Sequence, residues 1–417
     1  LGVRTGAVRV DFAKVIARKR AIVRQWRAGV TEDLDGAGKR LRLVHGHARF
    51  VGEREIEVDG ERHAAETVVV NTGARPLVPS LPGLETVPWL DNARLMELDA
   101  LPSHLLVLGG GYIACEFGQM FRRYGSKVTI VQRGRHLLDR EDPDVSGALE
   151  EVFRKEGIRI LLGAEGRSVA RKGNSIVVTL SNGRKVAGSH LLVAVGRRPN
   201  TDDLGCEKAG IALDERGAIL VDGRYRTSAP GVYAVGDVTG GPQFTHSSWD
   251  DHRLLYSLLF EGGTRGRNDR VVPYSVFTDP QVARVGLSET EAREKGVRFE
   301  VATMPFGHIA RAIEIDETAG LMKVLLDPES ERILGAAIVG AEAGELIHIF
   351  VALMQARATA RAIVDSEAIH PTLAEGVQSL VMRLPRYDLD RPASVREVVP
   401  SARAVPGEPL RQTVPRA

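Results

Sequence analysis

A histidine and a glutamate near the C-terminus have the residue types and spacing of an acid–base pair. They are His370 and Glu375, in the run His-Pro-Thr-Leu-Ala-Glu. An imidazole exchanges protons near neutral pH, and a carboxylate on its second nitrogen would fix the tautomer and stabilise the imidazolium. An isolated His-Pro dipeptide is usually a surface turn. The block therefore predicts either a catalytic base or a turn, and the added carboxylate favours the base.

A glycine-rich turn in the first third of the chain has the pattern of a nucleotide-binding site. The apolar run 105–108 leads into Gly-Gly-Gly-Tyr-Ile-Ala, which fits G-x-G-x-x-A, and the helical pattern 112–124 follows. The first glycine allows a tight turn, the second lets the backbone approach a diphosphate, and the alanine allows close helix–strand contact. The helix would then aim its N–H groups at the phosphates. The residues predicted to form this site are Gly109, Gly110, Gly111, Tyr112, Ile113 and Ala114.

The residues after the next strand predict which nicotinamide cofactor binds. A fingerprint alone can be only a glycine-rich turn, but here the strand pattern 127–131 follows at the expected distance. An acidic residue at the end of that strand would accept from the ribose 2′-hydroxyl, whereas arginines accommodate a 2′-phosphate. This chain has Gln132, Arg133 and Arg135 there. The pattern favours NADPH; if both arginines are solvated loop cations, NADH stays open.

An aspartate at the end of a short buried strand is a candidate ligand for sugar or polyol hydroxyls. Asp237 closes the run Gly-Val-Tyr-Ala-Val-Gly-Asp, residues 231–237. Ligands of open α/β sheets bind at the carboxyl ends of the strands, where a carboxylate can accept hydrogen bonds from hydroxyl groups. The alternative is a helix N-cap or turn aspartate.

Composition and charge exclude several classes of protein. A chain of 417 residues is too long for one core and predicts two or three domains. The net charge of +2 gives no general attraction to nucleic acid or an anionic membrane, and no apolar run is long enough to span a bilayer. A cytoplasmic protein is therefore expected. Cys115 and Cys206 match neither a disulfide framework nor a zinc site, and no metal site is predicted.

Four ordered motifs make the chain resemble the pyridine nucleotide–disulfide oxidoreductases, especially the branch of mercuric reductase and dihydrolipoyl dehydrogenase. They are the runs 72–76, 109–116, 231–237 and 370–375. Any one of them could arise by chance, but all four in this order and spacing identify the family. The similarity extends from near the N-terminus to about Tyr387.

The resemblance implies an α/β fold with two doubly wound dinucleotide-binding domains and a C-terminal α+β dimerisation domain. The FAD-type domain would be incomplete and split between residues 1–77 and 200–271, with the NAD(P)-type domain inserted as residues 78–199. Residues 272–387 would form the dimerisation domain, and residues 388–417 a flexible tail.

The resemblance also implies FAD, held by residues from distant parts of the chain. Asp237 matches the aspartate that binds the ribityl chain. Gly196 matches a glycine on the nicotinamide side, although an ordinary domain-crossing turn would explain it as well. The residues matched to the turn against FAD are Thr72, Gly73 and Ala74, and those leading into the helix that faces the flavin are Gln243, Phe244, Thr245 and His246.

Further catalytic assignments come from the same resemblance. Tyr112 resembles the tyrosine that covers the flavin until nicotinamide arrives, and Glu116 the glutamate that pairs with a lysine beside the redox disulfide. The two residues share one face of a helix, and the alternative is that this face packs on its own sheet. His370 would reach the disulfide of the other subunit, which implies a homodimer with shared active sites.

The chain departs from the family at its beginning. Nothing before Val68 provides the expected strand with its own G-x-G-x-x-G, or the C-x-x-x-x-C pair. Cys115 lies in a predicted helix and Cys206 in a loop, so neither replaces that pair. We therefore expect a sequence truncated before Leu1. The sheet of the first domain would lack its starting strand and leave Val68 and Val70 poorly covered.

Together the motifs predict a FAD-dependent NAD(P)H oxidoreductase that acts on a disulfide or related acceptor. His370 and Glu375 would exchange protons with a thiol, and this chain would be inactive as it stands. The lack of a C-terminal cysteine pair argues against mercury, while lipoamide, glutathione, a quinone and other acceptors stay open. One alternative is a flavin NAD(P)H oxidase or peroxidase relative. Another is a catalytically inactive nicotinamide-binding and dimerising module.

Overall fold

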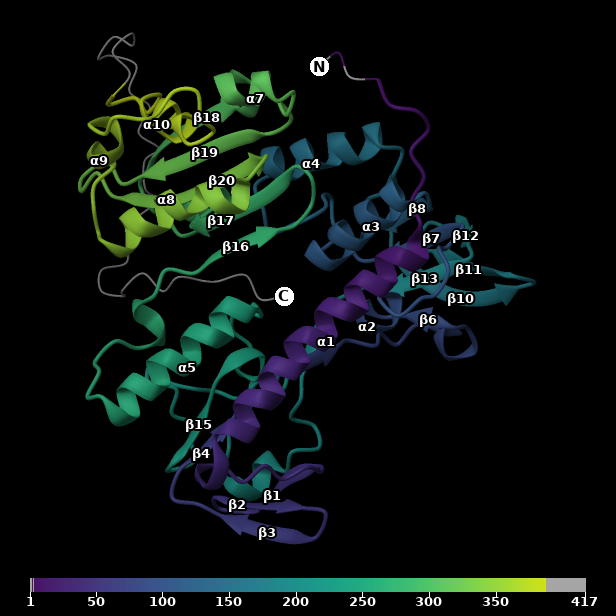
Figure 1. The fold of residues 1–417 in the computed structure, drawn as a ribbon, viewed down its shortest axis with the longest axis vertical. Helices are drawn as coiled ribbons and strands as arrows, with labels where there is room; N and C mark the ends of the chain where they lie inside the picture. The colour runs from purple at the N-terminus through teal and green to yellow at the C-terminus, as the bar shows by residue number, and fades with distance from the viewer. Residues whose placement is uncertain (1, 3, 388–417) are drawn as a thin grey trace.

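The computed structural model describes residues 2 and 4–387, so the predicted tail 388–417 lies outside the described residues. Figure 1 shows two layered parts side by side, one built on a parallel and one on an antiparallel sheet, with a third part below them. The long helix α1 (Phe12–Gly36) crosses in front of the third part. The α/β fold class predicted from the sequence is confirmed.

A five-stranded parallel sheet, in the order β6-β13-β7-β8-β9, carries the glycine turn. The strands are β6 (Trp89–Leu90), β7 (His104–Leu108), β8 (Lys127–Val131), β9 (Arg159–Leu161) and β13 (His190–Val193). They are almost continuously apolar because both faces are covered. Leu105 and Val107 face the helices, whereas Leu106 and Leu108 face a second sheet. The covering elements are α2 (Asn92–Leu95), α3 (Tyr112–Tyr124), α4 (Pro143–Lys155), β10 (Gly166–Lys172), β11 (Ser175–Leu180) and β12 (Lys185–Gly188).

A five-stranded antiparallel sheet, in the order β16-β17-β20-β19-β18, forms the C-terminal part. Its strands are β16 (Pro273–Val276), β17 (Gln281–Gly286), β18 (Glu300–Pro305), β19 (Leu321–Leu326) and β20 (Ile333–Gly340). One face packs under the helices of this part, around the buried side chains of Met322 and Phe350. On the other face, Val282 and Val339 join the core that contains α4. The helices are α6 (Glu289–Glu294), α7 (Ala310–Glu314), α8 (Ala343–Gln355), α9 (Arg361–Val364) and α10 (Glu375–Val381).

The third part brings together chain segments from before and after the parallel sheet. β4 (Val68–Val70) pairs in parallel with β15 (Val232–Ala234), and β5 (Ala74–Pro76) pairs with β14 (Arg197–Pro199) where the chain crosses back. Helix α5 (Thr245–Phe260) follows β15. A meander of β1 (Ala48–Gly52), β2 (Glu55–Val58) and β3 (Glu61–Ala64) completes this part.

The prediction that Val68 and Val70 are poorly covered is wrong. Their exposed fractions are 8% and 4%, because they lie in a core with Phe50 and Val238. Side chains alternate along a strand, so both valines share one face, and Val69 on the other face is 46% exposed. The burial of Val68 and Val70 therefore gives no support to a missing strand.

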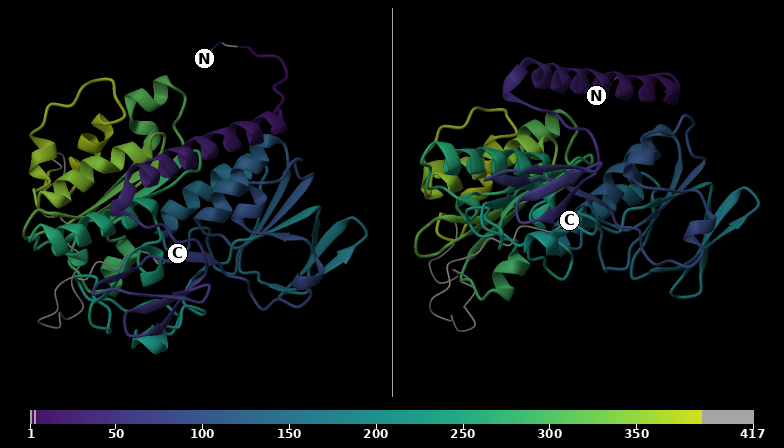
Figure 2. Two further views of the ribbon diagram at one scale, coloured as in Figure 1. Left: turned by 60° about the horizontal axis from the view of Figure 1, so that its bottom comes forward. Right: turned by 90° about the horizontal axis from the view of Figure 1, so that it is seen from below.

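Helix α1 is attached to the rest of the molecule mainly through its first two turns (Figure 2). Asp11 caps the helix by accepting a hydrogen bond from a backbone N–H of the first turn. The Phe12 ring lies 5.9 Å from the rings of Phe121 and Tyr124 on α3, and no residue of α1 beyond Ile16 is buried. Within residues 2 and 4–387, no helix has the length and apolar character required to cross a membrane.

Candidate functional site

The turn between β7 and α3 has a backbone that requires glycine. Gly109 has a φ of +108°, and a Cβ there would lie 2.2 Å from the Ala194 carbonyl oxygen. A Cβ on Gly111 would meet no atom within 4 Å, so the turn is open on that side. Ala114 is fully buried between the helix and the sheet, where its small side chain allows close packing. The turn is thus tight at its base and open at its tip.

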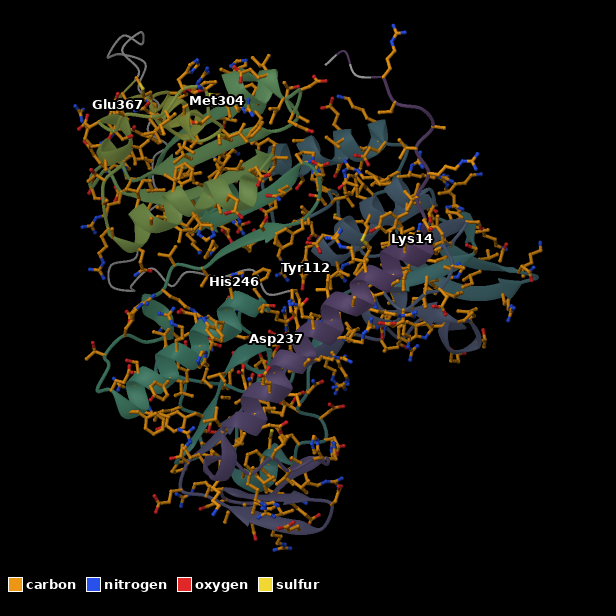
Figure 3. The ribbon with its side chains drawn as sticks, in the orientation of Figure 1. Lys14, Tyr112, Asp237, His246, Met304 and Glu367 are labelled. Atoms are coloured by element: carbon orange, nitrogen blue, oxygen red, sulfur yellow. The ribbon has the colours of Figure 1, made fainter. Side chains whose placement is uncertain are left out.

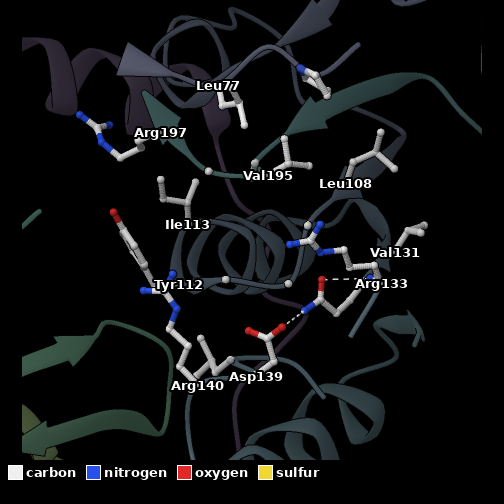
Figure 4. Close-up of a pocket in the computed structure, with 18 of the residues that line it drawn as sticks. Leu77, Leu108, Tyr112, Ile113, Val131, Arg133, Asp139, Arg140, Val195 and Arg197 are labelled. Atoms are coloured by element: carbon white, nitrogen blue, oxygen red, sulfur yellow. Dashed lines mark hydrogen bonds between the residues drawn. The ribbon is translucent and has the colours of Figure 1, made fainter. Parts of the chain in front are cut away.

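A pocket of about 420 Å³ lies in front of the open tip of this turn (Figure 4). Its walls include the start of α3, the loop after β8, the start of β14, the residue before α5, β16, and the segments 77–81 and 164–166. The predicted site residues that line it are Gly109, Gly110, Gly111, Tyr112, Ile113, Gln132, Arg133, Gly196 and Phe244. Residues predicted for the nicotinamide site thus line one cavity together with Phe244, which was predicted for the flavin site.

The three residues predicted to select the nicotinamide cofactor lie in different environments. Gln132 is buried, and its Nε2 donates to the Asp139 carboxylate over 3.2 Å. Arg133 lines the pocket. Arg135 is exposed, as Arg133 is, but it lies outside the pocket lining.

Asp237 is connected to the pocket through one arginine. The Arg197 Nη2 donates to Asp237 Oδ2 over 3.2 Å and to the Ala74 carbonyl oxygen over 2.7 Å. Burial raises the pKa of Asp237, and the Arg197 guanidinium opposes that shift. Arg197 itself lines the pocket. Sequence reasoning missed Arg197, whose only signal was its position directly after Gly196.

The turn that contains Thr72, Gly73 and Ala74 is fastened to the chain where it crosses back. The Thr72 hydroxyl donates to the Asn200 carbonyl oxygen over 3.0 Å, and the Asn200 Nδ2 donates to the Thr72 carbonyl oxygen over 2.8 Å. Gly73 has a φ of +71°, and a Cβ on it would meet no atom within 4 Å. The turn is therefore held rigidly while the Gly73 backbone stays open to approach.

The segment that leads into α5 contributes an aromatic stack. The Phe244 ring stacks on His246 at 5.3 Å and on Tyr274 at 5.5 Å, and it lies 6.2 Å from the Tyr112 ring. Thr245 is the first residue of α5, and His246 Nε2 is 2.8 Å from the Pro273 carbonyl oxygen. The Gln243 Oε1 is buried, and it has no hydrogen-bond partner within the described part of the chain.

Tyr112 and Glu116 lie close together but have different surroundings. Tyr112 lines the pocket, and burial raises the pKa of its phenol, with Arg197 opposing the shift and the Asp237 and Glu116 carboxylates adding to it. Glu116 Oε1 accepts from the Phe277 backbone N–H over 2.8 Å, beyond the pocket lining. The first turn of α3 therefore points toward Asp237, and its second turn toward the C-terminal part.

His370 and Glu375 form the contact expected of an acid–base pair. The Nδ1 of His370 lies 2.8 Å from the Oε2 of Glu375. The imidazole is 69% exposed, whereas the carboxylate is only 17% exposed. The pair does not meet the pocket within one chain: Glu367, three residues earlier, lies on the far side of the C-terminal part from Tyr112 (Figure 3).

The two cysteines are separate and buried. Cys115 belongs to the core around α3, and Cys206 to the core around β4 and β15. Burial raises the pKa of both thiols, so neither thiolate is favoured at neutral pH. Among the described residues, no group of three or more histidine, cysteine, aspartate or glutamate side chains could hold a metal ion.

The residues present fit a dinucleotide and the ribityl–flavin part of FAD. The open position on Gly111 leaves room for a ligand against the start of α3, and the open position on Gly73 leaves room for one against the turn at residues 72–74. Two buried polar atoms, Arg197 Nε and Gln243 Oε1, lack partners in the described chain and are available to a ligand. Asp237 offers a carboxylate that is bound to Arg197.

Comparison with known proteins agrees with this geometry. The family described as pyridine nucleotide-disulphide oxidoreductase matches residues 8–251, and the dimerisation domain of that family matches residues 272–381. The chain belongs to the pyridine nucleotide-disulphide oxidoreductases, so the family predicted from the four motifs is confirmed. Members are flavoprotein oxidoreductases that act on sulfur or disulfide groups, with FAD as cofactor and NAD(P)H as substrate.

Individual relatives cover most of both chains. The probable pyridine nucleotide-disulfide oxidoreductase RclA of Escherichia coli K12 is 38% identical over 89% of this chain and 85% of its own length. Dihydrolipoyl dehydrogenase of Thermus scotoductus is 37% identical over 84% of this chain and 78% of its own length. The solved structure of the HOCl-induced flavoprotein disulfide reductase RclA from Escherichia coli has a TM-score of 0.84 at 37% identity. The match covers 89% of this chain and 86% of that one. The crystal structure of LpdA from Mycobacterium tuberculosis has a TM-score of 0.82 at 30% identity. The match covers 91% of this chain and 84% of that one.

Proposed function

We propose that this chain binds NAD(P)H in the pocket before α3 and a flavin on the side of Asp237. The observation that carries the proposal is the Arg197 side chain, which lines the pocket and also binds Asp237 over 3.2 Å. One guanidinium therefore joins the two sides of the site. When bound, the two cofactors supply the hydride and electron transfer of the family's reaction, and the protein binds and orients them.

Three groups of residues would hold the flavin. The Asp237 carboxylate would accept hydrogen bonds from the ribityl hydroxyls, and the turn Thr72–Ala74 would bring its backbone against the cofactor. The N-terminal end of α5, with Gln243 to His246, would stabilise negative charge on the ring. These residues would form one domain, 1–77 and 200–271, interrupted by the nicotinamide domain 78–199.

The proposed cofactor preference is NADPH, and it depends on Arg133. This residue lines the pocket, and no carboxylate stands at the end of β8 to accept from a ribose 2′-hydroxyl. We expect Arg133→Gln to weaken NADPH binding about tenfold and to leave NADH binding nearly unchanged, because only NADPH carries the 2′-phosphate. Fluorescence titration of both nucleotides checks this. Equal losses for NADH and NADPH would contradict it.

His370 and Glu375 would exchange protons with a thiol at a site completed by a second subunit. Their 2.8 Å contact fixes the Nδ1 of His370, and the other ring nitrogen of this exposed imidazole would exchange the proton with the thiol. The separation of this pair from the pocket within one chain supports a homodimer with shared sites. An oxidase or peroxidase is less favoured, because the pair suits thiol protonation. The proposed acceptor is a disulfide or a related sulfur group, because the family acts on sulfur or disulfide groups.

A second candidate is a nicotinamide-binding, dimerising module without disulfide turnover. The observation that favours it is the burial of both Cys115 and Cys206, which leaves this chain without an accessible thiol. Titration of the purified chain with NADPH, followed by assay with FAD and a soluble disulfide, tests both candidates. We expect NADPH binding without disulfide-dependent oxidation. Absence of NADPH binding would overturn both.

A further inference from the structure

The loop between β8 and α4 is fixed directly to the glycine turn. The Leu138 backbone N–H donates to the Gly110 carbonyl oxygen over 2.8 Å, and the Ser146 hydroxyl donates to the Leu138 carbonyl oxygen over 3.2 Å. Leu138 has a φ of +48°, which a branched, bulky side chain seldom adopts. Such a conformation persists only where the surroundings determine it. The four charged residues that follow, at 139–142, are therefore held at a defined place beside the turn.

The third charged residue of this loop is bound to the C-terminal part. Glu141 accepts from the Tyr274 hydroxyl and pairs with Arg284, whose Nε is 3.2 Å away. Arg284 is almost completely buried and also binds Glu291 over 2.8 Å. A buried charge in such a network cannot leave it without leaving its partners unpaired.

The fourth charged residue is bound just as firmly. Asp142 accepts from the backbone N–H groups of Glu289 and Thr290, over 3.0 and 2.9 Å, and lies 3.3 Å from the buried Lys323 ammonium. The first charged residue, Asp139, accepts from Gln132. Three of the four charged side chains at 139–142 thus have protein partners.

Arg140 is the exception. It lines the pocket, and within residues 4–387 its guanidinium has no hydrogen-bond or ion-pair partner. Figure 4 shows its side chain running from the loop toward Tyr112, beside the start of α3. Burial lowers the pKa of Arg140, the neighbouring Asp139 carboxylate opposes the shift, and the cations Arg216 and Arg284 add to it. An arginine so placed stays charged and is suited to an anion with oxygen acceptors.

We propose that Arg140 binds the diphosphate of the nicotinamide cofactor, together with the N–H groups at the start of α3. The inference rests on the proposed nicotinamide site and names a residue that the glycine fingerprint does not contain. Glu141 and Asp142 hold the loop from one side and Leu138 from the other, so the Arg140 guanidinium is presented to the diphosphate. A bidentate guanidinium contact adds both affinity and orientation.

The test compares three ligands that share a diphosphate: ADP-ribose, NADH and NADPH. We expect Arg140→Gln to raise the dissociation constant of all three by about tenfold or more, and Arg140→Lys to restore part of the loss. Arg184→Gln, which removes an equal charge from the exposed turn after β11, is the matched control and should bind as the wild type does. Calorimetric titration of the 417-residue chain measures each constant, and circular dichroism confirms that each variant is folded.

The outcomes separate this inference from the proposed function. If the wild-type chain binds none of the three ligands, the proposed nicotinamide site is wrong and the inference fails with it. If the wild type binds and Arg140→Gln binds equally well, only the inference is overturned. A loss confined to NADPH would also overturn it, because it would place Arg140 at the 2′-phosphate.

Discussion

Glu116 shows how burial of one carboxylate should appear in the pH dependence of stability. Burial raises its pKa, and the Phe277 N–H opposes the shift. A folded-state pKa above the unfolded value means that the ionised form is disfavoured in the fold. Glu116→Gln keeps the oxygen that accepts from Phe277. We therefore expect it to be more stable than the wild type at pH 7, with the difference disappearing below about pH 4, the ordinary range of a glutamate.

Urea unfolding at a series of pH values measures this difference. Glu215→Gln, at an exposed position, is the control and should change stability little at any pH. If the free energy of unfolding of the wild type instead rose relative to that of Glu116→Gln as the pH increased, the account would be contradicted.

Sequence reasoning located the fingerprint residues but not every side chain that completes the site. Gly109 and Gly111 are recognisable because their roles depend on the backbone of one contiguous turn. Arg197 is not, because it is brought to Asp237 from a distant segment. Arg140 is not, because its place is set by the contacts of Glu141 and Asp142 with the C-terminal part. Arg135 was grouped with Arg133, yet two residues along a loop are enough to take it out of the pocket lining.

At the scale of elements, the strand–turn–helix unit depends on Gly109. An alanine there would need a φ of +108° and would place its Cβ 2.2 Å from the Ala194 carbonyl oxygen. We expect Gly109→Ala to lower the free energy of unfolding by about 3 kcal/mol. Gly147→Ala, inside α4 with no atom within 4 Å, is the matched control and should raise it by about 0.5–1 kcal/mol. Urea unfolding distinguishes the two, and equal effects would be inconsistent with a strained turn.

The elements themselves were predictable where the apolar pattern is long. The strand at residues 105–108 and the helix at 112–124 are both observed, because a buried parallel strand and an amphipathic helix leave strong patterns. The coverage of Val68 and Val70 was not predictable. It comes from Phe50 and from residues as distant as Leu204 and Val238, whose packing no local pattern records.

At the scale of the whole molecule, three parts of the chain meet at one pocket. The parallel sheet supplies the glycine turn, β14 supplies Arg197 with its contact to Asp237, and β16 supplies Tyr274 behind Phe244. The order of the four motifs identified the family from the sequence alone. The meeting of the glycine turn and Arg197 at one cavity depends on the crossing-back pair β5–β14, whose strands of three residues each leave only a weak pattern in the sequence.

The most direct test of the central claim fills the pocket at the tip of the turn. Gly111→Val adds a side chain where no atom lies within 4 Å, at an extended backbone position that valine adopts readily. We expect its thermal midpoint to match the wild type while the dissociation constant of NADPH rises at least about tenfold, because the valine would occupy the place of the diphosphate. Fluorescence titration with NADPH measures this. A folded Gly111→Val variant that binds NADPH as tightly as the wild type would contradict the account.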